Sequence, residues 1–87
     1  MIRVAFYVRD DRSGWRLGDK DYLTRFKDIT ELTTSARAEV PAEEVNILEE
    51  LPQGMVAPKD GWVLSFTCGA LEPIYIAAWP DDIEHGR

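Results

Sequence analysis

The chain has 87 residues, of which 45% are hydrophobic and 30% are charged, and its formal net charge is −6 at pH 7. This composition excludes a disordered chain, and no apolar run reaches the roughly 18 residues that a membrane-spanning helix needs. We therefore predict a single domain over 1–87, whose small core buries about 60–65% of the surface that the unfolded chain exposes, and no association with a membrane. The N-terminal residues lack the features of a signal peptide, which predicts a cytoplasmic protein.

Two reactive side chains occur once each. Cys68 is the only cysteine and His85 the only histidine, so the chain has neither an internal disulfide nor an ordinary Cys/His zinc site. We expect Cys68 to pack as a small hydrophobe and His85 to lie in a polar, frayed tail over 81–87. The sequence also has no Gly-rich phosphate loop and no nucleophile elbow. We therefore predict no enzymatic activity, no cofactor and no metal site.

The N-terminal residues alternate between apolar and other side chains from Ile2 to Arg9, which predicts a β-strand. A turn follows, and 15–17 is a candidate for a short returning strand. At the other end, 61–80 contains two apolar runs separated by a break at 69–72, a pattern typical of a β-hairpin with a four-residue connection.

Between these strands the spacing of apolar residues favours helices. Tyr22 and Phe26 lie four residues apart and predict a helix over 19–27. For 29–39 the spacing and a capping residue at Asp28 favour a helix, but the same residues also alternate as a strand does. A third helix is expected from Pro41 to Leu51, because proline and carboxylates suit a first helical turn.

The predicted fold is therefore a small α+β domain. Its antiparallel sheet consists of the N-terminal strand and the C-terminal hairpin, with two or three short helices inserted between them and packed on one face. The face that the helices should cover carries Ile2, Val4, Phe6, Val8, Leu64, Phe66, Ile74 and Ile76. The second face should carry Arg3, Tyr7, Arg9, Thr67, Tyr75 and Trp79.

The acidic residues are concentrated in the middle of the chain. Residues 28–50 contain seven acidic and one basic side chain, whereas residues 1–27 contain four acidic and seven basic ones. An acidic protein gains nothing from counterion release on nucleic acid, so we expect no direct binding to DNA or RNA. These carboxylates form either an ordinary solvated helix face or a surface that binds Lys and Arg of a partner. The candidate partner-binding residues are Glu39, Glu43, Glu44 and Glu50.

The aromatic side chains of the second face are the other candidates. Tyr7, Tyr75 and Trp79 beside arginines are typical of a protein hot spot or a stacking platform, unless another part of the chain or a second subunit covers them. The sequence thus favours a protein-binding module, in its most concrete form an inhibitor or antidote that occupies a basic site of a nuclease or other nucleic-acid-binding protein. The alternative is a ligand-binding, accessory or oligomerisation domain that uses the aromatic face, and a homodimer is compatible with either.

Overall fold

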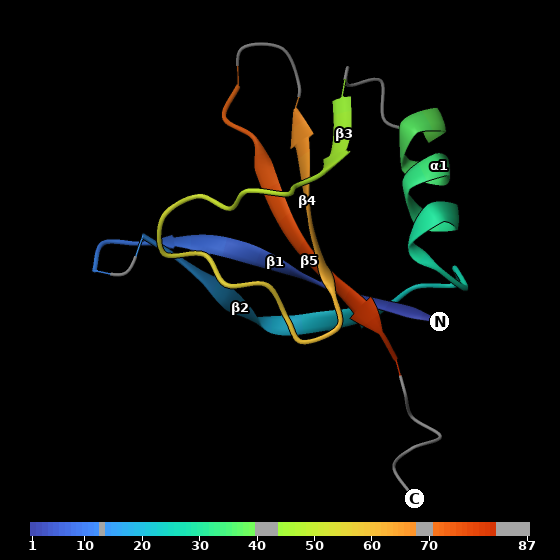
Figure 1. Cartoon of the computed structure of the whole chain (residues 1–87), viewed down its shortest axis with the longest axis horizontal. Helices are drawn as coiled ribbons and strands as arrows, with labels where there is room; N and C mark the ends of the chain where they lie inside the picture. Colours follow the sequence, from blue (N-terminus) through green and yellow to red (C-terminus); the bar gives the residue numbers. More distant parts are fainter. Residues whose placement is uncertain (13, 40–43, 68–70, 82–87) are drawn as a thin grey trace, which may run out of the picture.

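In the part of the chain that the structure describes, a five-stranded antiparallel sheet and one helix form the fold (Figure 1). The computed structural model describes residues 1–12, 14–39, 44–67 and 71–81. The spatial order of the strands is β2-β1-β5-β4-β3. In chain order, the elements are β1 (Ile2–Asp10), β2 (Gly14–Leu23), α1 (Ile29–Glu39), β3 (Glu44–Ile47), β4 (Trp62–Thr67) and β5 (Ile74–Pro80).

The predicted pairing of the two chain ends in one antiparallel sheet is confirmed. Val4 of β1 lies opposite Ala78 of β5, and Trp62 of β4 lies opposite the same alanine from the other side. The predicted returning strand after the first turn is also present, as part of the longer β2. The proposed four-residue connection of the C-terminal hairpin falls partly on 68–70, outside the described residues, as do Cys68 and His85.

The helix predicted over 19–27 is wrong, because these residues continue β2 to Leu23. Antiparallel pairing places Tyr22 opposite Val4, and the register shifts between Ala5 and Tyr7 to accommodate extra residues of β2. The local sequence Gly18-Asp19-Lys20-Asp21 contains poor helix formers, so the propensity that opposes strand pairing is weak. Hydrogen bonds to the neighbouring strand therefore decide the conformation here.

The helix predicted over 41–51 is also not formed where the structure describes the chain. Residues 41–43 lie outside the described part, and Glu44–Ile47 is the edge strand β3, antiparallel to β4. Val45 is buried, at 3% exposure, opposite Phe66. The two β-branched residues, Val45 and Ile47, fit an extended edge better than a helix. Over the described residues, the expected two or three helices are thus replaced by one helix, a longer β2 and the further strand β3.

For 29–39 the structure resolves the alternative in favour of the helix. The carboxylate of Asp28 accepts a hydrogen bond of 2.9 Å from the backbone N–H of Glu31, which satisfies one of the free donors of the first turn. Glu31 in turn accepts a hydrogen bond of 2.9 Å from the N–H of Lys27. These two hydrogen bonds stabilise the first turn of the helix. They favour the helix over the strand in a Thr-rich segment whose intrinsic helix propensity is modest.

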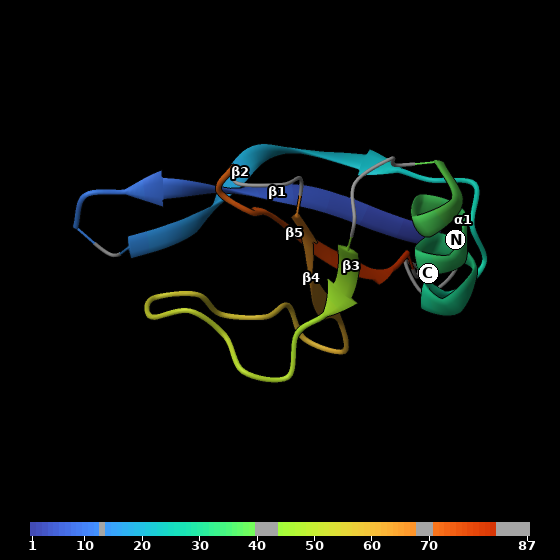
Figure 2. The same cartoon turned by 90° about the horizontal axis from the view of Figure 1, so that it is seen from above.

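The two faces of the sheet are covered by different parts of the chain. On one face α1 packs its apolar side over Ile2, Val45, Leu64 and Ala78. On the other face lies the irregular segment 48–60, which joins β3 to β4 (Figure 2). The second core cluster on this face contains Tyr7, Met55, Val63 and Ala77, with Leu48, Leu51 and Ala57 packed against it.

The hairpin of β1 and β2 extends beyond the rest of the sheet (Figure 2). Pairing of β1 with β5 ends at Phe6, whereas pairing with β2 continues to Asp10. A two-stranded ribbon is marginally stable alone, so it needs support from outside the pair. Segment 48–60 supplies this support. A Cβ built on Gly14, whose φ is +92°, would lie 2.8 Å from the carbonyl oxygen of Gln53, so only glycine allows this close approach.

Candidate functional site

The structure brings together the three aromatic residues that the sequence proposed as binding residues. Tyr7, Tyr75 and Trp79 all belong to the cluster under segment 48–60. Tyr7 is only 7% exposed, and Tyr75 and Trp79 are half-buried. Trp15 completes the group, with its ring centroid 5.0 Å from that of Tyr75. A large part of this aromatic surface is therefore used for packing within the chain.

The Tyr7 side chain ties β1 to segment 48–60. Its hydroxyl donates a hydrogen bond of 2.6 Å to the backbone carbonyl of Val56. Burial raises the pKa of the Tyr7 phenol above its ordinary value of 10.0. The ionised form has lost the donated proton and would lie in a poorly solvated position, so the fold favours the neutral phenol.

This shift predicts a loss of stability at high pH. The unfolded chain releases the Tyr7 proton near pH 10, whereas the folded chain retains it, so the contribution to stability is complete below about pH 10 and decreases as the pH rises through the folded-state pKa. Urea unfolding between about pH 9 and pH 11 should show a flatter pH dependence in Tyr7→Phe than in wild type. Tyr22→Phe, at a half-exposed ring, is the matched control and should behave as wild type. Equal slopes in all three proteins would contradict this role of Tyr7.

The acidic candidates do not converge on one described surface. Glu39 is exposed at the end of α1, which covers one face of the sheet, and Glu50 is exposed on segment 48–60, which covers the other. Glu44 begins β3, with its backbone opposite Thr67, and Glu43 lies outside the described residues. The acidic binding surface therefore stays a prediction. Among the described residues, Glu39 and Glu50 are exposed but lie on opposite sides of the sheet.

An uncovered apolar surface lies on the sheet face that the helices were expected to bury. Since α1 reaches only part of this face, several large side chains beyond it are exposed. The ring centroids of Phe6 and Tyr22 lie 6.4 Å apart, edge to face. We call this surface the open face; it consists of Phe6 (44% exposed), Val8 (36%), Tyr22 (52%) and Ile74 (50%).

The register places the open-face residues on one side of the sheet. Phe6 lies opposite Ile76 and Ile74 lies opposite Phe66, so both share the face of the buried Ile2 and Leu64. Tyr22 lies opposite Val4 of the same face. Phe6 and Tyr22, in contact with each other, form the aromatic part of this surface, and large exposed apolar patches on monomers are often functional.

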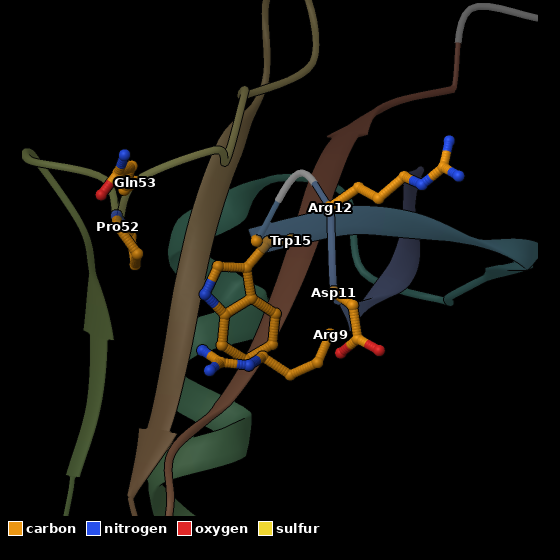
Figure 3. Close-up of a pocket in the computed structure, with 7 residues that line it drawn as sticks. Arg9, Asp11, Arg12, Trp15, Pro52 and Gln53 are labelled. Carbon is orange, nitrogen blue, oxygen red and sulfur yellow. The ribbon is translucent and has the colours of Figure 1, made fainter.

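A cleft lies on the opposite face, where the β1–β2 hairpin approaches segment 48–60 (Figure 3). Its volume is about 430 Å³. The Arg9 guanidinium carbon lies 5.0 Å from the centroid of the Trp15 ring. Sequence reasoning placed Arg9 on this face but missed Trp15, since nothing local in the sequence shows that 48–60 folds back over the hairpin. The other lining residues are Asp11, Arg12, Gly14, Pro52 and Gln53.

Comparisons with family models, curated proteins and solved structures found no match. Within the described residues, no helix is long and apolar enough to cross a membrane. The same residues contain no cluster of three or more His, Cys, Asp or Glu side chains suited to hold a metal ion. The candidate surfaces must therefore be judged by their own chemistry.

Proposed function

We propose that this protein acts by binding another protein and that the open face is its contact surface. The observation that carries the proposal is the exposure of Phe6 and Tyr22 in edge-to-face contact, with Ile74 exposed on the same face of the sheet. Single exposed apolar residues are ordinary, but a contiguous patch on a rigid element is typical of an interface. Two aromatic rings and two β-branched side chains supply contact area at a low cost in side-chain entropy.

The charge of the chain supports a partner with a basic surface. The net charge of −6 favours encounter with a positively charged protein and disfavours direct contact with nucleic acid. The exposed carboxylate of Glu39, on the helix that covers part of the same sheet face, is available for such contacts, whereas Glu50 lies on the opposite side of the sheet. In its most specific form, the proposal is an inhibitor or antidote that occupies a basic site of a nuclease or another nucleic-acid-binding protein.

Affinity capture from the source cell with matched variants tests this function. The tagged double variant Phe6→Ser, Ile74→Ser should retain the fold but bind the captured partner at least tenfold more weakly, because hot-spot side chains each contribute about 2 kcal/mol or more. Val56→Ser is the control, since Val56 is also an exposed apolar residue, at 75%, but lies on segment 48–60. Its affinity should equal that of wild type. Circular dichroism and thermal unfolding verify that both variants are folded.

The contrary outcomes are distinct. Equal affinity of the double variant and wild type would remove the open face from the interface. If instead Glu39→Lys with Glu50→Lys abolishes binding, the acidic residues alone carry the contact. Sedimentation of the purified chain covers the remaining case: a wild-type dimer that the double variant converts to a monomer would assign the open face to a second copy of this chain.

A further inference from the structure

The cleft between the hairpin and segment 48–60 has hydrogen-bond donors on one wall. Figure 3 shows the Arg9 side chain lying along Trp15, with its guanidinium group and the indole nitrogen of Trp15 both directed toward Pro52 and Gln53. An indole N–H only donates, and a guanidinium group presents several donors in one plane. The space that both groups face is therefore suited to an acceptor group of a ligand.

Arg9 differs from Arg3 and Arg16 in its partners. In the described part of the chain, Arg3 and Arg16 form ion pairs with aspartates, but Arg9 forms none and only stacks on Trp15. Contact with the ring face leaves the N–H donors of this exposed side chain free. An unpaired guanidinium group beside a second donor favours bidentate binding of a planar carboxylate.

The charge around the cleft limits the charge of the ligand. Arg9 and Arg12 each contribute a positive charge and Asp11 a negative one, so the lining has a net charge of +1. In Figure 3 the Arg12 side chain points away from Trp15, and Asp11 lies on the side of Arg9 away from Pro52. This arrangement favours a monoanionic ligand. A dianion such as phosphate would be repelled more strongly by Asp11, and only the guanidinium group of Arg9 would balance its charge.

A second, mostly apolar hollow of about 320 Å³ shares Trp15 with the cleft. Its lining contains one charged side chain, Arg16, which is paired with Asp10. The other lining residues are Tyr7, Leu17, Gly54, Val56, Ala57 and Pro58. We propose that the cleft and the hollow together bind a small amphipathic carboxylate: Arg9 and the Trp15 indole hold the carboxylate, and its apolar chain occupies the hollow. This site is on the face opposite the open face and is independent of the proposed protein contact.

Titration with simple carboxylates tests the site. Hexanoate is expected to cause a saturable shift of the Trp15 indole N–H signal in NMR spectra, assigned by its loss in Trp15→Phe. Acetate should bind at least tenfold more weakly, because each buried methylene adds about 0.8 kcal/mol. Arg9→Ala should weaken hexanoate at least tenfold, since it removes a charge-assisted contact. Arg25→Ala is the matched control: the Arg25 guanidinium also stacks on a ring, 4.9 Å from that of Phe26, but Arg25 does not line the cleft.

Each other outcome overturns part or all of the proposal. The absence of a saturable shift with hexanoate, or equal binding by wild type and Arg9→Ala, refutes the carboxylate site. Equal affinity for acetate and hexanoate refutes the role of the apolar hollow. The last titration uses inorganic phosphate at matched ionic strength. If phosphate binds as tightly as hexanoate, the assignment of a monoanionic carboxylate ligand is wrong.

Discussion

Replacing Leu64 with alanine should destabilise the fold by about 2–5 kcal/mol, the range for a buried leucine that leaves a cavity. Leu64 has no exposed surface and lies in the centre of β4, between Ile76 of β5 and Ile47 of β3. The core cluster under α1 contains it together with Ile2, Val45 and Ala78. In a small domain whose total stability is about 5–15 kcal/mol, this loss removes a large fraction.

Urea unfolding followed by circular dichroism measures this effect. Leu23→Ala is the matched control, because Leu23 is 48% exposed at the end of β2 and should lose less than about 1 kcal/mol. A loss of similar size in both variants would contradict the placement of the core between α1 and the sheet.

Replacing Gly61 with alanine should cost about 1–3 kcal/mol through overpacking. A Cβ at this position would lie 2.5 Å from the carbonyl oxygen of Ala78 and 2.9 Å from the Pro58 ring. Neither neighbour is the end of a flexible side chain, so the backbone of β5 or the turn must move. The substitution therefore tests how closely segment 48–60 returns to the sheet before β4.

The adjacent residue offers the control for Gly61→Ala. Asp60 has a φ of +59°, a conformation that glycine adopts more readily than other residues. Asp60→Gly should therefore keep or slightly increase the stability, by less than about 1 kcal/mol. If Gly61→Ala is as stable as wild type in thermal and urea unfolding, the close packing of the turn on β5 is wrong.

Sequence patterns predicted the parts of the fold that depend on local structure. The alternation from Ile2 to Arg9 and the two runs of the C-terminal hairpin correspond to β1, β4 and β5. For 29–39 the spacing and the Asp28 cap favoured a helix but left a strand open, and the structure has α1 there. In each of these segments the local propensity and the long-range pairing favour the same conformation.

The failures concern segments in which a neighbouring strand decides the conformation. Tyr22 has helical spacing from Phe26, but pairing with β1 makes 14–23 extended. Val45 and Leu48 have helical spacing too, yet β4 offers an unpaired edge that 44–47 occupies. Apolar spacing over fewer than ten residues does not distinguish these outcomes, because it contains no information on available partners.

The same limit applies to the candidate surfaces. Alternation placed Phe6 and Ile74 correctly on the face of Leu64, and Tyr7 correctly on the face of Tyr75 and Trp79. It did not predict which face would be covered, because one helix replaced the expected two or three and segment 48–60 covered the aromatic face instead. The open face and the cleft of Arg9 and Trp15 both follow from this tertiary arrangement.

The most direct test of the proposed function is an NMR map of the surface that the captured partner contacts. On addition of that partner, we expect the largest changes in side-chain signals at Phe6, Val8, Tyr22 and Ile74, with smaller changes at the rim. Changes confined to Glu39 and Glu50, or to the cleft around Arg9 and Trp15, with the open face unaffected, would contradict the account.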